Sequence, residues 1–340
     1  MQNIVIAGFG FMGGMHAQVY AQLPNAKLVA IVDGNRPAAE ANLKKLGLPT
    51  PIYATLEEAL AKHHFDVVDI CLPTPAHGAY VRQALKLGKA IFCEKPFAAT
   101  TKEAAAMAAA IKKAKVKAQV GQCLRFWPEY QAFVEFVRQK SAGKLLSLSM
   151  QRRSSRPGYS VGNWLNQGGL SGGAALDLHI HDTDFVHHLL GKPKAVTAVG
   201  TKDASGWSHI FTTYHFKGLA VTAEGGWNYP PKWGFQMAFQ AVFEKGTVEY
   251  DSSATPSLTV TRQDEARQPL PFTQPSAGES SLGSGNVSSL GGYFNELASF
   301  IADLEQGRMP KLATPQQAAE SVRTVNAEIR SLQTGRTVKL

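Results

Sequence analysis

Apolar runs and helix-like segments alternate along residues 1–122. Short apolar runs that predict strands are NIVIAG, KLVAIVD, DVVDICLP, KAIFCEKP and KAQVGQ. Apolar residues at helical spacing separate them, over residues 13–23, 37–46, 76–87 and 101–113. Alternation of strands and helices with short connections indicates a parallel sheet covered on both faces. We therefore predict a doubly wound α/β domain over residues 1–122.

A different pattern follows Gln122. Helices are expected over residues 127–139 and 174–190, and apolar and polar residues alternate in LLSLSMQRR, AVTAVGTK, HIFTTYHF, LAVTAEGGW, FQMAFQAVF and GTVEYDS. Successive alternating segments joined by tight turns predict a large, mostly antiparallel open sheet. Residues 262–292, rich in Gly, Ser, Pro and Gln, are expected to form a long loop. Helices over 293–306 and 315–332 complete a predicted α+β domain over residues 123–340.

A glycine-rich turn directly follows the first predicted strand. In Gly8-x-Gly10-x-x-Gly13, the first glycine permits a tight turn, the second lets a pyrophosphate approach the backbone, and the third lets the helix pack on the strand. Phosphates then lie at a helix N-terminus, where free N–H groups favour negative charge. The motif predicts the phosphate-binding part of a Rossmann domain, and a glycine turn without a ligand is the alternative. The predicted turn comprises Gly8, Gly10, Phe11, Met12 and Gly13.

An acidic residue follows at the distance that such a site requires. Asp33 ends the second predicted strand, 20 residues after Gly13. Its carboxylate would accept a hydrogen bond from the ribose 2′-OH of NAD and repel the 2′-phosphate of NADP. Arg36 lies nearby and would act in the opposite sense. We expect NAD as cofactor, in preference to NADP.

Further cofactor contacts are expected in CLPTPAHGAY, after the strand at residues 66–73. Ligands of such sheets bind outside the carboxyl ends of the strands, so Leu72, Thr74 and His77 should line the cofactor cleft. For His77, a solvent-facing position at the start of a helix is the alternative. CEKP follows the next strand, which places Glu94 and Lys95 near the same cleft. A lysine there would stabilise a developing alkoxide or act as an acid or base.

The stretch SGGAALDLHIHDTDF, residues 171–185, combines several acidic and imidazole side chains. On one continuous helix, Asp177 and His181 are four residues apart and share a face, which Asp184 and His188 continue. His179 would point elsewhere, about 200° from Asp177. A carboxylate beside an imidazole predicts an oriented acid–base pair. A polar helix surface and a divalent-metal site are alternatives, but metal hydrolases typically place such a histidine pair at a strand end, so we expect no metal.

Charge and composition narrow the function classes. The formal net charge is +9, and residues 125–156 carry seven basic and two acidic residues. Nucleic-acid binding is not supported, because interleaved aromatic residues and a helix-turn-helix pattern are missing. An anionic small substrate or a scattered basic surface would explain the cluster. The sequence has no run of about 18 apolar residues, so we expect no membrane span. The chain start resembles a strand rather than a signal peptide. The three dispersed cysteines favour a cytoplasmic location.

In combination, these motifs resemble the Gfo/Idh/MocA oxidoreductase family over nearly the whole chain. The segments that carry the resemblance are GFGFMG, Asp33, CEKP, RF at 125–126, GGAALDLHIHDTDFVHHLLG, AVFEKGTVEYD and YFNELASFI. The resemblance implies homodimers or homotetramers that bury the C-terminal sheet. It also implies a catalytic triad of Lys95, from the E-K-P motif, with Asp177 and His181, from the D-x-x-x-H motif. The family often has glycine where this chain has His179.

The implied activity is NAD-dependent oxidation of a secondary alcohol of a sugar, a cyclitol or a sugar derivative. His181 would take the hydroxyl proton, Lys95 would stabilise the oxygen charge, and Asp177 would orient His181, while the nicotinamide accepts the hydride. A redox-neutral glycosidase or lyase that retains NAD and oxidises C3 transiently is one alternative. A non-catalytic, nucleotide-sensing regulator is another.

Substrate contacts are expected from the start of the second domain. We hypothesise that Arg153 contacts an acidic sugar through the fork of its guanidinium group. The rival hypothesis is that the arginines pair with acidic residues across a subunit interface. The candidate substrate-binding residues are Arg125, Arg153, Tyr159, Asn163, Trp164 and His179.

Overall fold

The structure of the protein is a computed structural model, which describes residues 1–279 and 290–340. The chain divides into two compact units. The first unit comprises Met1–Cys123, Tyr159–Trp164 and Pro275–Val322. The second comprises Leu124–Gly158, Leu165–Gln274 and Arg323–Leu340. The first break falls after Cys123, and the chain then returns twice to the first unit, whereas the predicted domains were two continuous segments divided after residue 122. Residues 280–289 of the predicted loop lie outside the described residues.

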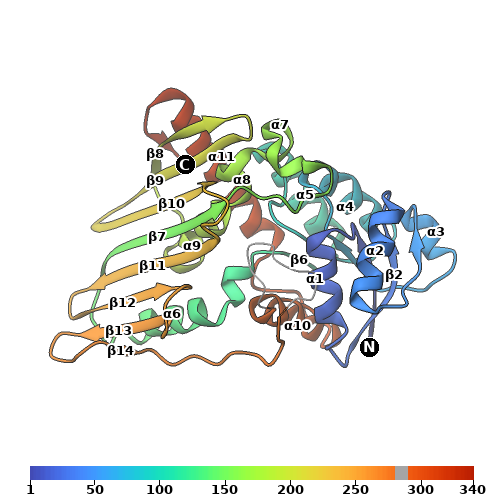
Figure 1. Cartoon of the computed structure of the whole chain (residues 1–340), viewed down its shortest axis with the longest axis horizontal. Coiled ribbons are helices and arrows are strands. Elements are labelled where there is room, and N and C mark those ends of the chain that lie inside the picture. Colours follow the sequence, from blue (N-terminus) through green and yellow to red (C-terminus); the bar gives the residue numbers. More distant parts are fainter. Residues whose placement is uncertain (280–289) are drawn as a thin grey trace. The chain divides into compact units, whose positions relative to one another are not determined.

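The first unit contains a six-stranded parallel sheet of order β3-β2-β1-β4-β5-β6 (Figure 1). This confirms the predicted doubly wound domain, and the short β3 and α3 are additions to it. The strands are β1 (Gln2–Ala7), β2 (Ala26–Val32), β3 (Ile52–Tyr53), β4 (Val67–Ile70), β5 (Ala90–Cys93) and β6 (Ala118–Val120). The helices are α1 (Phe11–Tyr20), α2 (Arg36–Leu46), α3 (Leu56–Leu60), α4 (His77–Lys86), α5 (Thr101–Ala114) and α10 (Gly291–Glu305).

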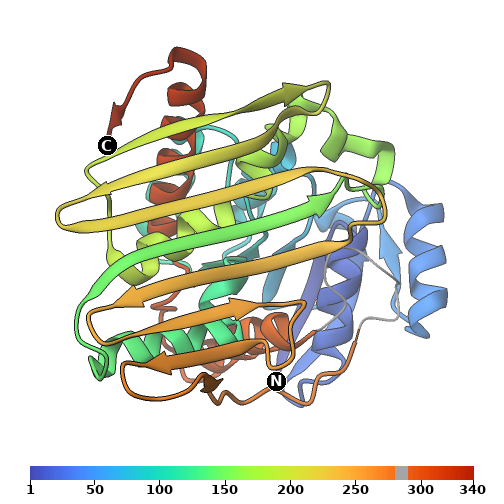
Figure 2. The same cartoon turned by 60° about the vertical axis from the view of Figure 1, so that its left-hand side comes forward.

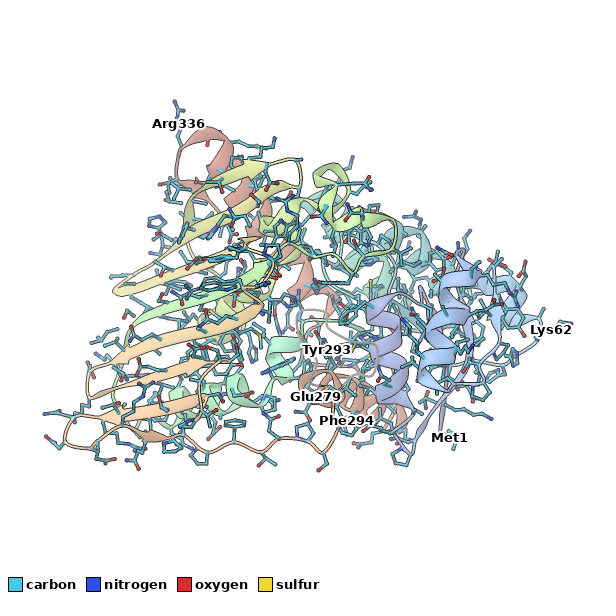
Figure 3. All side chains as sticks on the ribbon, in the orientation of Figure 1. Met1, Lys62, Glu279, Tyr293, Phe294 and Arg336 are labelled. Carbon is cyan, nitrogen blue, oxygen red and sulfur yellow. The ribbon has the colours of Figure 1, made fainter. Side chains whose placement is uncertain are left out.

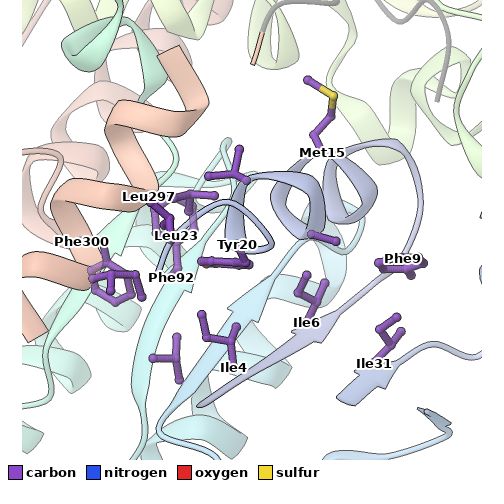
Figure 4. Close-up of a cluster of buried hydrophobic side chains, with 14 of the residues drawn as sticks. Ile4, Ile6, Phe9, Met15, Tyr20, Leu23, Ile31, Phe92, Leu297 and Phe300 are labelled. Atoms are coloured by element: carbon purple, nitrogen blue, oxygen red, sulfur yellow. The ribbon is translucent and has the colours of Figure 1, made fainter. Parts of the chain in front are cut away.

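Helix α10 joins the first unit because it completes the apolar core on one side of the sheet. Leu297 and Phe300 of α10 are fully buried in the same cluster as Leu23 and Phe92 (Figure 4). The rings of Phe92 and Phe300 lie 5.6 Å apart, edge to face. Tyr293, near the start of α10 (Figure 3), packs against the same cluster. An apolar helix face of this kind must be buried against another element, and the parallel sheet provides that surface.

The second unit contains a nine-stranded sheet of order β14-β13-β12-β11-β7-β10-β9-β8-β15 (Figure 1). Among the described strands of this sheet, β7 and β10 form a parallel pair and the other pairs are antiparallel, as predicted. The strands are β7 (Leu145–Ser155), β8 (Ala195–Asp203), β9 (Gly206–Phe216), β10 (Leu219–Tyr229), β11 (Phe235–Phe243), β12 (Gly246–Asp251), β13 (Leu258–Arg262), β14 (Gln268–Pro269) and β15 (Val338–Lys339).

Helices cover one face of this sheet and leave the other face open within the described part of the unit (Figure 2). On the covered face lie α6 (Pro128–Gln139), α8 (Gly173–Asp177), α9 (Ile180–Leu190) and the end of α11 (Pro315–Thr334). Phe133 of α6 stacks on Phe239 of β11 with ring centroids 4.5 Å apart. On the open face, the side chains of Val199 and Phe211 are 65% and 49% exposed. Apolar exposure of this kind marks a candidate contact surface.

The predicted helix over residues 174–190 is interrupted. Helix α8 ends at Asp177 and α9 begins at Ile180, and the His179 N–H donates to the Ala174 carbonyl at 2.8 Å, one residue further back than in an α-helix. Gly173, at φ +74°, precedes the break, and a Cβ there would lie 2.7 Å from the Trp207 backbone. This close approach fixes α8 against β9. Asp177 and His181 therefore lie on consecutive helical segments rather than on the single continuous helix that was expected to give them a common face.

Candidate functional site

The glycine turn has the geometry of a phosphate-binding turn. Gly8 has φ +92°, and a Cβ at Gly13 would lie 2.1 Å from the Gly8 carbonyl oxygen, so both positions require glycine. Helix α1 begins after Gly10 with no side-chain cap and no acidic residue in its first turn. Its first N–H groups and the positive end of its dipole suit an anion. The residues present therefore fit the pyrophosphate of a dinucleotide.

The Asp33 carboxylate is fixed at the carboxyl end of β2. Its Oδ2 accepts the Phe9 N–H and its Oδ1 accepts the Asn35 N–H, both at 2.6 Å. The Arg36 guanidinium donates to Glu40 at 2.9 Å on the exposed side of α2. The acidic group is thus held rigidly at the predicted ribose position, whereas the basic group already has an anionic partner. This arrangement favours NAD over NADP.

Thr74 and His77 follow β4 and are both buried. The buried Thr74 Oγ1 atom has no hydrogen-bond partner among the described residues, and a polar group of the cofactor would satisfy it. The His77 Nε2 atom lies 2.7 Å from the Leu72 carbonyl oxygen, and its Nδ1 atom lies 3.0 Å from the Pro96 carbonyl oxygen. Burial lowers the pKa of His77. The expectations that its ring faces the cofactor or solvent are therefore corrected, because this imidazole lies between two loops.

A buried network missed by the sequence analysis lies behind Glu94 and Lys95. Glu94 Oε2 accepts the Lys95 backbone N–H at 3.1 Å, and Glu94 Oε1 lies 3.2 Å from His16 Nε2. The other ring nitrogen of His16 lies 2.8 Å from Asp69 Oδ2. Gly121 leaves room for the carboxylate, since a Cβ there would lie 2.5 Å from Glu94 Oε1. The only sequence signal was that His16 lies one helical turn beyond Gly13.

Three of the predicted substrate contacts, Tyr159, Asn163 and Trp164, belong to the first unit. The ring centroids of Tyr159 and Phe11 lie 5.0 Å apart. A Cβ at Gly10 would lie 3.8 Å from the Val161 side chain. This segment therefore packs against the phosphate-binding turn, and Tyr159 is placed to affect cofactor binding.

In the second unit, the acidic residues of α9 form internal ion pairs. Asp184 receives two hydrogen bonds from Arg125, at 2.7 and 2.8 Å, and Asp182 receives two from Arg152, at 2.8 and 3.1 Å. All four side chains are buried. This corrects the assignment of Arg125 to an anionic substrate, because its guanidinium fork binds Asp184. The rival hypothesis placed the acidic partners of the arginines across a subunit interface, but Asp184 and Asp182 belong to the same chain as Arg125 and Arg152.

His179 is also used within the second unit. Its ring is fully buried, with Nε2 3.2 Å from Thr212 Oγ1 and 3.3 Å from Glu328 Oε2. A Cβ at Gly225 would lie 2.7 Å from His179 Nδ1, so the imidazole packs directly on β10. These contacts correct the expectation that His179 binds substrate and explain a histidine at this position by packing.

Arg153 lies on the open face of the sheet. Its neighbour Arg152 points toward α9, and successive side chains of a strand point to opposite faces. Arg153 lies beside Glu224, at 3.9 Å, and donates to Gln151. It is therefore on the opposite face of the sheet from Asp177 and His181. This placement contradicts the hypothesis that Arg153 contacts a substrate bound at these two residues.

Asp177 ends α8 and is 8% exposed, and His181 lies in the first turn of α9. Further along α9, burial and then the charge of Arg125 lower the pKa of His188 to about 4. His188 is thus neutral at physiological pH and belongs to the packed part of the helix. Asp177 and His181, on either side of the helix break, stay the acid–base candidates of this segment.

A dinucleotide-binding turn on a parallel sheet, joined to an α/β unit with a mostly antiparallel sheet, defines a nucleotide-dependent oxidoreductase fold. Residues 2–122 match the description "Oxidoreductase family, NAD-binding Rossmann fold", and residues 130–249 match "GFO/IDH/MocA C-terminal domain". The chain belongs to the GFO/IDH/MocA oxidoreductase family. This confirms the family, the fold class and NAD as the cofactor inferred from the motifs.

Individual relatives agree with this assignment. Inositol 2-dehydrogenase of Rhizobium meliloti (strain 1021) is 26% identical over 313 residues, which cover 89% of this chain and 88% of that protein. The scyllo-inositol 2-dehydrogenase (NAD(+)) of Bacillus subtilis (strain 168) is 32% identical over 197 residues, which cover 55% of this chain and 53% of that protein. The match therefore spans about half the length of the Bacillus enzyme.

Solved structures share the fold over the full length. The complex of levoglucosan dehydrogenase with NADH and levoglucosan has a TM-score of 0.83 at 20% identity, covering 99% of both chains. GenD2 from gentamicin A biosynthesis, in complex with NAD, has a TM-score of 0.82 at 25% identity, covering 100% of this chain and 96% of that one. Among the described residues, no helix is both long and apolar enough to cross a membrane.

Proposed function

We propose that the protein is an NAD-dependent dehydrogenase that oxidises a secondary alcohol of a neutral sugar, a cyclitol or a related polyol. The observation that carries the proposal is the fixed Asp33 carboxylate at the phosphate-binding turn of a GFO/IDH/MocA chain. Relatives named as inositol, levoglucosan and D-apiose dehydrogenases support the substrate class.

The proposed chemistry assigns one task to each of three side chains. His181 accepts the hydroxyl proton, Asp177 orients the His181 ring, and the Lys95 ammonium group stabilises the negative charge that develops on the oxygen. Bound NAD supplies the hydride acceptor. Gly8, Gly10 and Gly13 would hold the pyrophosphate, and Asp33 would hold the adenosine ribose. A general base of this kind typically contributes about 10²–10⁴ to the rate.

The ion pairs of the second unit support a neutral substrate rather than an acidic one. A carboxylate substrate calls for a guanidinium group that is not already bound by a carboxylate. Arg125 and Arg152 each bind an aspartate of α9 through two hydrogen bonds. We accordingly replace the preference for an acidic sugar with a preference for an uncharged polyol.

A redox-neutral reaction is the second candidate. The 2,7-anhydro-N-acetylneuraminate hydratase of Escherichia coli (strain K12) is 28% identical over 241 residues, which cover 68% of this chain and 63% of that protein. An enzyme of this second kind would regenerate NAD within each turnover. It would transform its substrate without accumulating NADH.

We further propose that the open face of the nine-stranded sheet is covered by a second copy of the chain, in a homodimer or homotetramer. Exposed Val199 and Phe211 support this proposal. Replacing both with lysine should give a monomer in analytical ultracentrifugation, and an unchanged mass would count against it. A cytoplasmic location is proposed because all three cysteines are thiols.

The experiment that tests the main proposal follows both NADH and product. The protein is incubated with NAD and a panel of cyclitols, neutral sugars, sugar acids and glycosides, with absorbance of NADH and chromatography of the products as readouts. A dehydrogenase forms NADH and a ketone in equal amounts from a neutral polyol. Product without NADH would favour the redox-neutral reaction, and oxidation of sugar acids alone would contradict the neutral substrate.

A further inference from the structure

A buried polar network joins helix α1 to the segment that carries Lys95. Asp69 Oδ2, on β4, lies 2.8 Å from His16 Nδ1 and accepts the Tyr20 hydroxyl at 2.9 Å. His16 Nε2 lies 3.2 Å from Glu94 Oε1, directly after β5. His16 and Asp69 are fully buried, and Glu94 is 4% exposed. Such a network is rare in a protein interior unless its groups satisfy one another.

We propose that His16, held by Asp69, is a positioning residue that fixes the Glu94 carboxylate and, through it, the backbone of Lys95. The inference rests on the proposed function, because Lys95 is the side chain that would stabilise the substrate oxygen. It assigns a role to two residues, His16 and Asp69, that the catalytic mechanism does not use.

The charge of His16 explains how it acts. Burial is the largest single effect and disfavours the imidazolium form, but the charge interactions and hydrogen bonds with Asp69 and Cys71 together outweigh it, and the pKa of His16 is raised well above its ordinary value. The charged groups that face the ring are Asp69 and Glu94, and its other titratable neighbours are Cys71 and Tyr20. His16 and Glu94 lie 3.2 Å apart without the alignment of a hydrogen bond, so their attraction is one of charge.

Glu94 transmits this attraction to Lys95. Its Oε2 accepts the Lys95 N–H at 3.1 Å, and the close approach to Gly121 leaves no room for a side chain beside Oε1. On the other side of Lys95, the Pro96 carbonyl oxygen lies 3.0 Å from His77 Nδ1. Without His16, the buried carboxylate loses its cationic neighbour at Oε1, which removes one of the contacts that fix its position. A displacement of about 1 Å at a catalytic group lowers a rate by about 10².

The same cluster must be tested for metal binding. The ligand atoms of His16, Asp69 and Cys71 lie within 4.8 Å of one another. Burial raises the pKa of the Cys71 thiol, and a metal ion would have to displace its proton to bind there. Atomic emission analysis of the purified enzyme should find no stoichiometric metal. One zinc or iron per chain, lost in His16→Asn, would overturn the positioning role.

A double-mutant cycle tests whether His16 acts through Glu94. His16→Asn should lower kcat at least about tenfold and change KM for NAD less than about threefold. In a Glu94→Gln background the same substitution should change kcat less than about threefold, because the carboxylate through which it acts is gone. Tyr20→Phe removes the other donor to Asp69 and is the matched control, with kcat expected within about twofold of wild type. Equal losses from His16→Asn in both backgrounds would overturn the proposal.

A second readout does not depend on activity. Lysines are dimethylated with ¹³C-formaldehyde, and the Lys95 resonance is identified by its absence in Lys95→Arg. His16→Asn should shift or split this resonance, whereas Tyr20→Phe should leave it unchanged. An unchanged Lys95 resonance in His16→Asn would refute the positioning role, whatever the activity.

The two readouts separate the two proposals. A wild-type enzyme that oxidises no polyol, with a Lys95 resonance that responds to His16→Asn, would contradict the proposed function and support the positioning role. If His16→Asn does not fold, Glu94→Gln alone must shift the Lys95 resonance, and no shift would overturn the proposal.

Discussion

Replacing Asp33 with asparagine should remove most of the preference for NAD over NADP. The 2′-phosphate of NADP carries a charge of about −1.5 to −2 near neutral pH. About 4 Å from a carboxylate in water, it is repelled by roughly 1.5–2 kcal/mol. That energy corresponds to a preference of about 10- to 30-fold. Because Asp33→Asn removes the charge and keeps a carbonyl acceptor, the ratio of the two dissociation constants should fall about tenfold.

Calorimetric titration with each cofactor measures this ratio without a substrate. Asp33 accepts two backbone N–H groups, from Phe9 and Asn35, so the variant loses one acceptor and about 1 kcal/mol of stability, which thermal unfolding checks. Arg36→Gln is the matched control and should change the ratio less than about twofold, because Arg36 is bound to Glu40. An unchanged ratio in Asp33→Asn, or a large shift in Arg36→Gln, would show that Asp33 does not set the preference for NAD.

Three further predictions concern stability and cofactor affinity. The pKa of His188 is about 4 in the folded protein, below its ordinary value of 6.5. As pH drops from about 6.5 toward 4, the unfolded chain therefore takes up a proton before the folded protein does, and stability falls. His188→Asn should reduce the fall in Tm between pH 7 and 5, and an equal fall would contradict the burial of His188. Arg125→Met leaves Asp184 buried without its cation and should lower the free energy of unfolding by about 3–5 kcal/mol in urea, whereas a loss under 1 kcal/mol would contradict the buried pair. Tyr159→Ala removes the ring that packs on Phe11 and should weaken NAD binding by roughly 1 kcal/mol in calorimetry; unchanged affinity would remove Tyr159 from the cofactor site.

The parallel sheet and its glycine turn were predictable because their causes are local. Apolar runs such as Ile4–Ala7 are buried on both faces, and a parallel strand requires that pattern. Gly8 and Gly13 lie in the turn and helix start directly after this strand. Glycine is required at Gly8 by its positive φ and at Gly13 by the nearby Gly8 carbonyl oxygen, so both causes lie within a few residues. The sequence did not predict that Tyr159–Trp164 and Pro275–Val322 belong to the first unit. Such packing, for example of Tyr159 on Phe11, joins residues far apart in the sequence.

Residues 171–185, which carry the proposed acid–base pair, likewise show that contacts between distant residues could not be predicted. Their spacing proposed Asp177 and His181 as the acid–base pair, but periodicity along one helix could not show that Asp184 binds Arg125, 59 residues away. It also could not show that the helix is interrupted between Asp177 and Ile180, or that Gly173, at the start of α8, meets the backbone of β9. The network of His16 and Asp69 was missed for the same reason, because its partners come from separate elements.

In the proposed reaction, this chain transfers hydride from a neutral polyol to NAD with His181 as base. The most direct measurement is the rate of NADH formation by wild type and His181→Ala on the polyol that wild type oxidises. His187→Asn, on the same helix, is the control for disturbance of α9. We expect His181→Ala to lower kcat by about 10²–10⁴ with unchanged NAD affinity, while His187→Asn stays within about threefold of wild type. NADH formation that survives in His181→Ala, or none from any polyol with wild type, would contradict the proposed reaction.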